Sequence, residues 1–113
     1  MRYMCLIYDD ENAFWQLSDA ERSAVYLRYR ALREELVQTG RFVDGSQLAP
    51  THKSTTVRVR NGATQATDGP FAETREQLGG YILIEAKDLN EAIAVAARIP
   101  TASNGAIEVR ELI

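Results

Sequence analysis

Two short segments of this chain are hydrophobic at nearly every position, which is the pattern of strands covered on both faces. Residues 2–8 and residues 81–86 both have this pattern. In the first segment, one face carries Tyr3, Cys5 and Ile7. The other face carries Met4, Leu6 and Tyr8. Because successive side chains of a strand point to opposite faces, neither segment has a side suited to water. We therefore predict two strands that need packing partners above and below.

Two helices are predicted from the residues that begin and end them. Ser18 and Glu21 have the spacing of a capping box, in which each side chain bonds the backbone N–H of the other residue. This helix should end just before Gly40, because glycine favours the left-handed conformation found after helices. A second, shorter helix rich in alanine should begin after Asp88 and end before Pro100.

The remaining strands are predicted by alternation and by turn residues. Residues 55–60 alternate between two faces, and Asn61-Gly62 is the typical pair for a type I′ turn. Residues 63–67 should therefore return as the second strand of a hairpin. Residues 41–48 form a further, irregular strand, and residues 106–112 form the last one.

The predicted order of elements is β-α-β, a hairpin, and β-α-β, within a single domain of residues 1–113. With the hairpin as an insertion, this is the ferredoxin-like split βαβ plan of the α+β class. Two helices cover only one face of a four-stranded sheet, and monomers rarely expose a hydrophobic patch as large as the other face. Either the sheet of a second copy covers that face, or the hairpin and the loop after it fold over it. We predict the first arrangement, a homodimer through the sheet face.

Composition and charge exclude several classes of partner. The chain is 45% hydrophobic and 26% charged, as expected for a globular protein, and its net charge is −3. An acidic surface argues against binding to nucleic acid or to an anionic membrane, and no hydrophobic run approaches the ~20 residues that span a bilayer. The single cysteine excludes an internal disulfide and fits a reducing cytoplasm. With one histidine and no phosphate-binding glycine loop, we expect no metal and no cofactor.

The most distinctive segment is DGPFAETREQLGGY, residues 68–81, which is polar and rich in glycine and leads into the second hydrophobic strand. It resembles the DGPFAETKE signature of the DGPF branch of the YCII-related family, with Arg75 where that signature usually has lysine. The resemblance extends over almost the whole chain, from the opening strand to Glu108-Val109-Arg110. It implies a ferredoxin-like fold that assembles as a dimeric α/β-barrel, as in related proteins.

Asp68 and Glu73 are the candidate catalytic residues of this segment. If the loop holds them beside a cleft, partial burial would raise a carboxyl pKa toward the range useful for acid–base catalysis. A structural role is the alternative for both residues. Asp68 would cap its own turn before Gly69-Pro70, and Glu73 would pair with Arg75 or begin a helical turn.

Three aromatic residues are candidates for a ligand pocket. Phe71 either contacts a ligand or anchors the loop on the core, and Tyr81 follows at the start of its strand. By its spacing to the strand that begins at Arg41, Tyr29 corresponds to a histidine of shorter YCII relatives, for which an acid–base role has been proposed. Because the ordinary pKa of tyrosine is near ~10, Tyr29 would act as a hydroxyl donor or cavity wall, or simply pack in the core. We expect His52, in a polar connection, to be a solvated residue.

Two functions follow from the resemblance. The first is a cofactor-independent enzyme that acts on a small organic molecule in a cleft near the loop of residues 68–81. The second is a non-catalytic module that binds a ligand or a protein, because YCII-type domains also resemble partners of some sigma factors. A fold hosts many functions, so the sequence leaves both open.

Overall fold

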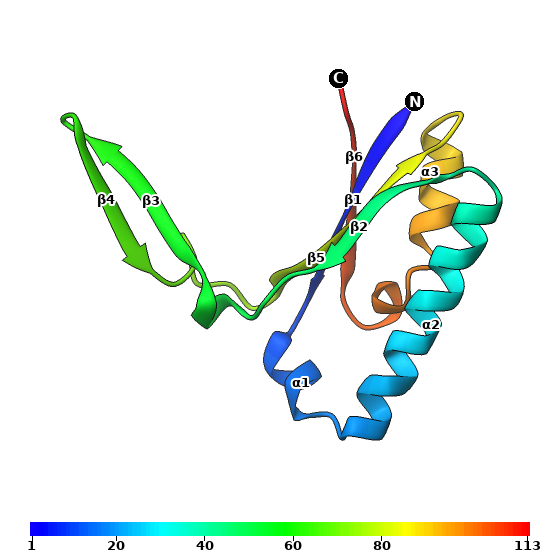
Figure 1. The fold of residues 1–113 in the computed structure, drawn as a ribbon, viewed down its shortest axis with the longest axis horizontal. Helices are drawn as coiled ribbons and strands as arrows, with labels where there is room; N and C mark the ends of the chain where they lie inside the picture. Colours follow the sequence, from blue (N-terminus) through cyan, green and yellow to red (C-terminus); the bar gives the residue numbers. More distant parts are fainter.

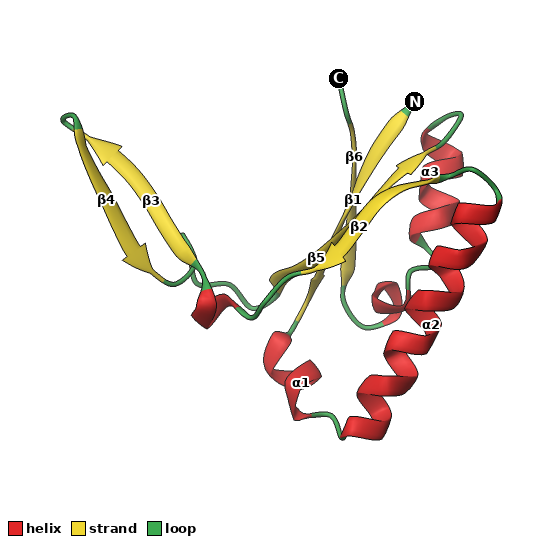
Figure 2. Ribbon diagram, in the orientation of Figure 1, coloured by secondary structure: helices red, strands yellow, loops and turns green.

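An antiparallel sheet of four strands carries one long and one short helix on one face, and a two-stranded arm extends away from it (Figures 1 and 2). The computed structural model describes all of residues 1–113. The sheet has the strand order β2-β5-β1-β6 and consists of β1 (Arg2–Asp9), β2 (Phe42–Gln47), β5 (Gln77–Glu85) and β6 (Ala106–Glu111). The arm pairs β3 (Thr55–Arg60) with β4 (Ala63–Asp68). These elements place the chain in the α+β class, as predicted.

The helices are α1 (Glu11–Gln16), α2 (Asp19–Gln38) and α3 (Leu89–Ala96), with short 3-10 turns η1 (Thr51–Lys53) and η2 (Pro100–Ser103). The capping box of Ser18 and Glu21 begins α2 as predicted, with both reciprocal hydrogen bonds present. Gly40 follows α2 with a φ of 72° and donates to the Val37 carbonyl, so the predicted end of this helix is confirmed.

The core lies between the sheet and the helices α2 and α3. Its most deeply buried large side chains come from all of these elements and are Tyr3, Cys5, Leu36, Ile84, Val95 and Ile99. The small residues Ala92 and Ala96 of α3 are buried as well, which lets this helix lie close to the strands. Burial of a large hydrophobic side chain contributes about 1.5–3 kcal/mol, so this layer is the main source of stability.

The opposite face of the sheet, which we call the open face, has no helix over it (Figure 1). The strand register puts a hydrophobic group there, made of Met4, Leu6, Tyr8, Leu78, Tyr81 and Leu83. Polar side chains border this group on the outer strands, where Glu108 and Arg110 form an ion pair on β6. The prediction that β1 and β5 are hydrophobic on both faces is therefore confirmed.

The arm does not cover the open face. Asn61 and Gly62 take positive φ angles of 51° and 75°, so the predicted hairpin turn is present. However, the arm projects away from the sheet (Figure 1), and every residue of β4 is exposed. The alternative in which the hairpin folds over the sheet of its own chain is thus wrong.

Two features were not predicted. After β1, Asp10 accepts hydrogen bonds from the backbone N–H groups of Asn12 and Ala13 and so begins the short helix α1. The strand β5 begins at Gln77, so the Gly79-Gly80 pair lies inside the sheet and not in the preceding loop. Gly80 is needed there, because an added Cβ would lie 2.8 Å from the Ser46 carbonyl oxygen of the neighbouring strand.

None of the helices combines the length and the hydrophobicity that crossing a membrane requires.

Candidate functional site

A cavity of about 300 Å³ lies between α2 and the helix-covered face of the sheet, and α1 borders one end of it. Its walls are largely aromatic. Phe14 of α1 makes edge-to-face contacts with Trp15 and with Tyr26 of α2, at centroid distances of 5.0 and 5.9 Å. These contacts hold the short α1 against α2, and so the missed helix is the element that shapes this end of the cavity.

Hydrogen bonds between distant segments fix the same end. The Glu11 backbone N–H donates to the side-chain oxygen of Gln77 at 3.0 Å. The Glu11 carboxylate in turn accepts from the backbone N–H of Thr51 at 3.0 Å and from its hydroxyl. Glu11 lines the cavity, but its hydrogen bonds connect α1 to η1 and β5, so its role is structural.

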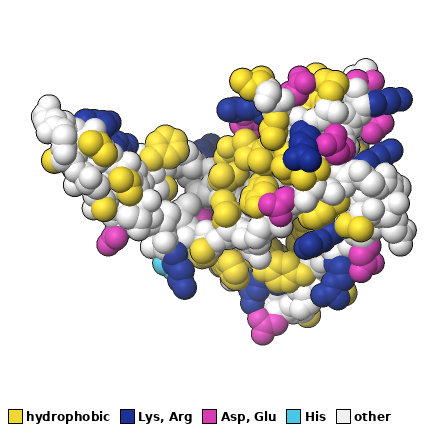
Figure 3. Space-filling model, turned by 45° about the horizontal axis from the view of Figure 1, so that its top comes forward, with side chains coloured by type: hydrophobic (Ala, Val, Ile, Leu, Met, Phe, Trp, Pro, Cys, Tyr) yellow, Lys and Arg dark blue, Asp and Glu magenta, His cyan; other side chains and the backbone are white.

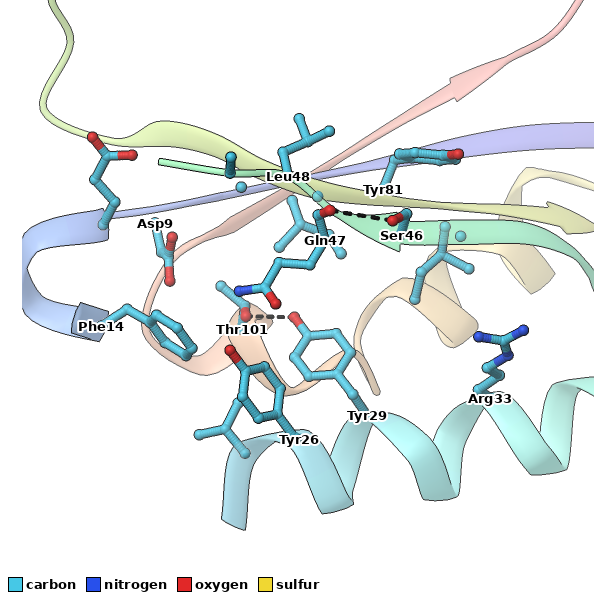
Figure 4. A pocket seen from close by; sticks show the side chains of 18 of the residues that line it. Asp9, Phe14, Tyr26, Tyr29, Arg33, Ser46, Gln47, Leu48, Tyr81 and Thr101 are labelled. Atoms are coloured by element: carbon cyan, nitrogen blue, oxygen red, sulfur yellow. Dashed lines mark hydrogen bonds between the residues drawn. The ribbon is translucent and has the colours of Figure 1, made fainter. Parts of the chain in front are cut away.

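Asp9, the last residue of β1, carries a second carboxylate at this end of the cavity. Its side chain points into the cavity (Figure 4), and no donor of the chain makes a hydrogen bond to its oxygens. Burial raises the pKa of the Asp9 carboxyl above its ordinary value, and the negative charges of Asp10, Glu11 and Glu76 raise it further. Part of the burial comes from Gly79, where even a Cβ would lie 3.5 Å from the Asp9 Oδ1.

Tyr29 and Thr101 form a polar pair at the base of the cavity. The Tyr29 hydroxyl and the Thr101 Oγ1 lie 2.5 Å apart in a hydrogen bond, and the amide of Gln47 extends toward them (Figure 4). Burial raises the pKa of Tyr29, which keeps its hydroxyl protonated at neutral pH. The cavity thus offers a carboxylate, a hydroxyl and an amide along otherwise hydrophobic walls.

Two exposed arginines of α2 line the rim of the cavity, and Arg33 lies at the end far from Asp9 (Figure 4). Arg30 and Arg33 both line it, and the guanidinium of Arg33 stacks 4.8 Å from the ring centroid of Phe42. Figure 4 shows Asp9 and Arg33 well separated, with the aromatic residues between them.

The predicted catalytic residues lie elsewhere in the chain. Asp68 ends β4 and Glu73 lies in the loop before β5; both are exposed, and neither lines the cavity. The backbone N–H of Gly69 bonds to the Ser54 carbonyl, and Thr56 Oγ1 donates to the Gly69 carbonyl, so backbone bonds hold the start of this loop. Asp68 and Glu73 therefore stay predictions.

The pocket candidates are divided between the cavity and the surface. Tyr29 is among the residues that line the cavity, and its role toward a ligand stays a prediction. Tyr81 borders it through the strand, but its ring points to the open face (Figure 4), where its hydroxyl donates to Asp44 Oδ2 at 3.1 Å. Phe71 is 78% exposed. It does not anchor the loop on the core of its own chain, so that expectation is wrong.

Sequence reasoning missed Asp9 and the rim arginines as functional candidates. Asp9 stood in an acidic run that reads as a solvated strand end, and Arg30 and Arg33 look like any charged positions of an exposed helix face. The spacing of the two arginines could have revealed them, because residues three or four apart lie on the same face of a helix. Tyr26 and Tyr29 share that face with Arg30 and Arg33, which indicates a face with both aromatic and positively charged side chains.

The lone cysteine and the lone histidine take no part in this site. Cys5 is fully buried in β1, and burial raises the pKa of its thiol to about 11, so the thiol is unreactive at neutral pH. His52 is exposed in η1, as expected.

The sequence of this chain is similar to a known family of proteins and to one further protein. The model of the YCII-related domain matches residues 1–113, the whole chain. The chain belongs to the YCII-related family. An uncharacterized protein of Rhizobium meliloti (strain 1021) is similar to this YCII-related chain, with 38% identity over 114 residues that cover 99% of the chain and 92% of the relative. Because family membership does not fix the chemistry, the function of this YCII-related protein has to be argued from its cavity.

Proposed function

We propose that this YCII-related protein is a cofactor-independent enzyme that transfers a proton to or from a small, largely hydrophobic organic molecule bound in the cavity. The observation that carries the proposal is the Asp9 carboxyl group. It lies inside an aromatic cavity, has no hydrogen-bond donor from the chain, and has a raised pKa. A raised pKa brings a carboxyl group closer to the range that is useful for acid–base catalysis near neutral pH.

The roles of the cavity residues follow from their positions. Asp9 as carboxylate would accept a proton from the ligand, and as carboxylic acid it would return a proton to the product. The Tyr29 hydroxyl, already paired with Thr101, would donate to an oxygen of the ligand, and the Gln47 amide would orient the same group. The aromatic walls would exclude water and keep the pKa of Asp9 raised.

Replacement of two aspartates distinguishes this site from the one predicted from sequence. A ligand found by thermal-shift screening of small organic acids and ketones would be followed by NMR for turnover. We expect Asp9→Asn to abolish turnover while ligand binding persists, because the amide cannot exchange the proton. The matched variant Asp68→Asn should retain turnover. Loss of turnover in Asp68→Asn at unchanged stability, with Asp9→Asn active, would move the catalytic site to the loop of residues 68–81.

We also propose that the protein is a homodimer through the open face, which would complete a ferredoxin-like, dimeric α/β-barrel of the DGPF branch. The strand order β2-β5-β1-β6 with α2 and α3 on one face supports the ferredoxin-like plan. Figure 3 shows hydrophobic side chains gathered in the middle of one face with charged side chains around them. A hydrophobic centre with a polar border is the usual anatomy of a protein–protein interface. Sedimentation velocity at micromolar concentration should report a dimer, and a well-folded monomer would refute it.

A further inference from the structure

The rim of the cavity holds two positive charges that the chain itself leaves without a carboxylate partner. Five other arginines form ion pairs with Asp or Glu side chains, and these are Arg2, Arg22, Arg41, Arg98 and Arg110. Arg30 and Arg33 form none, and no hydrogen bond of the chain uses their guanidinium groups. They are three residues apart on α2, so both lie on the helix face that borders the cavity.

The stacking of Arg33 on Phe42 restricts where its guanidinium can lie. Phe42 is itself a wall residue of the cavity, and the Arg33 Cζ is 4.8 Å from its ring centroid. No hydrogen bond of the chain uses the N–H donors of this guanidinium, and such donors match the two oxygens of a carboxylate. The rim therefore has the geometry of an anion-binding position next to an aromatic chamber.

The opposite end of the cavity is unfavourable for an anion. The acidic side chains of Asp9 and Glu11 both line it, and like charges repel. The cavity is thus polarised, with positive charge at the Arg33 rim, aromatic walls in the middle and carboxylates at the α1 end (Figure 4). A volume of about 300 Å³ is at the lower limit of ligand pockets, so the ligand is small.

Resting on the proposed function, we infer that the ligand of this cavity is a small organic carboxylate with an aromatic or alkyl body. Its carboxylate binds at Arg33 on the rim, with Arg30 adding positive charge. Its body lies between the aromatic walls, and its far end lies beside Asp9. The anion therefore fixes the orientation in which the ligand meets the acid–base group.

Matched pairs of charged and neutral probes test this inference. Binding of benzoate, phenylacetate and 3-phenylpropanoate would be measured by isothermal titration calorimetry and compared with binding of the corresponding primary amides. We expect at least one acid to bind the native protein about tenfold more tightly than its amide, which is the effect of one charge-assisted contact. In Arg33→Gln this preference should disappear while the amide binds as before, and Arg30→Gln should reduce it in part.

Arg28→Gln is the control, because Arg28 lies on the same helix but does not line the cavity. It should keep the preference for the acid. Unchanged binding of the amide in each variant shows that the cavity is intact. Equal binding of acids and amides by the native protein, or an unchanged preference in Arg33→Gln, would overturn the carboxylate inference and leave the proposed function standing. Failure of every acid and every amide to bind would count against both.

Discussion

At the residue scale, the Asp9 carboxyl group lowers the stability of the fold when it is charged. Its raised pKa means that folding disfavours its charged form, mainly through burial and then through the neighbouring charges of Asp10, Glu11 and Glu76. A group of this kind is a candidate for function because the fold maintains it in spite of that cost. The pH dependence of stability therefore tests the environment of Asp9 without any ligand.

Asp9→Asn should raise the melting temperature at pH 7. The pKa of the Asp9 carboxyl is higher in the folded state than in the unfolded state. The contribution of this group to the free energy of unfolding is therefore fully present below the unfolded-state pKa, and it is lost as the pH rises through the folded-state pKa. The native protein therefore carries a penalty at neutral pH that asparagine lacks. The difference should disappear below about pH 3.9, the ordinary pKa of aspartate. Thermal unfolding of both proteins between pH 3 and 8 measures it, and a native protein as stable as the variant at pH 7 would contradict the raised pKa.

The sequence could not identify Asp9, because its surroundings are tertiary. Only the pairing of β1 with β5 brings Glu76 and the backbone of Gly79 to the Asp9 carboxylate. Tyr29 became a candidate through its match to a histidine of YCII relatives, whereas its helical stripe alone favoured packing in the core. Phe71 illustrates the opposite error, because a hydrophobic residue in a loop suggests an anchor, whereas its ring is exposed in the single chain.

At the element scale, the boundaries set by local chemistry were predictable. The ends of α2 depend on a capping box and on one glycine with positive φ, and the turn of the arm depends on Asn61-Gly62, all of which act within a few residues. The helix α1 was missed because its six residues are held by aromatic contacts with α2 and by a link from Glu11 to Thr51. Short elements that depend on distant partners leave little local pattern.

Ser18→Ala should destabilise the protein by about 1 kcal/mol, the usual cost of losing an N-cap. The Ser18 hydroxyl accepts from the Glu21 N–H at 3.1 Å, and the Glu21 carboxylate accepts from the Ser18 N–H at 2.9 Å. The matched control is Ser23→Ala within the same helix, where alanine is the better helix former and stability should hold or rise slightly. Urea unfolding followed by circular dichroism measures both variants. Equal stability of the two variants would show that the capping box contributes nothing.

At the scale of the whole molecule, the arm is the part that a single chain does not explain. An isolated two-stranded hairpin is at best marginally stable in water, and nearly all residues of β3 and β4 are exposed. Val57 and Val59 are 61% and 58% exposed, and Phe71 beyond the arm is 78% exposed. The open face is also hydrophobic and uncovered. A second copy of the chain would cover both the arm and the open face. The sequence predicted the uncovered sheet face but not that the arm would also stand free.

Hydrogen exchange should therefore show the arm to be protected only in the dimer. If the proposed dimer forms, we expect the backbone amides of residues 55–68 to exchange slowly in the native protein, because a partner copy would lie against them. Leu83→Lys puts a charge in the centre of the open face and should give a monomer in which these amides exchange rapidly while β1 and β5 stay protected. Val37→Lys, on the exposed surface of α2, is the control and should remain a dimer with a protected arm. Slow exchange of the arm in a monomeric Leu83→Lys variant would show that the hairpin is stable by itself. Rapid exchange in a dimeric native protein would show that the arm lies outside the interface.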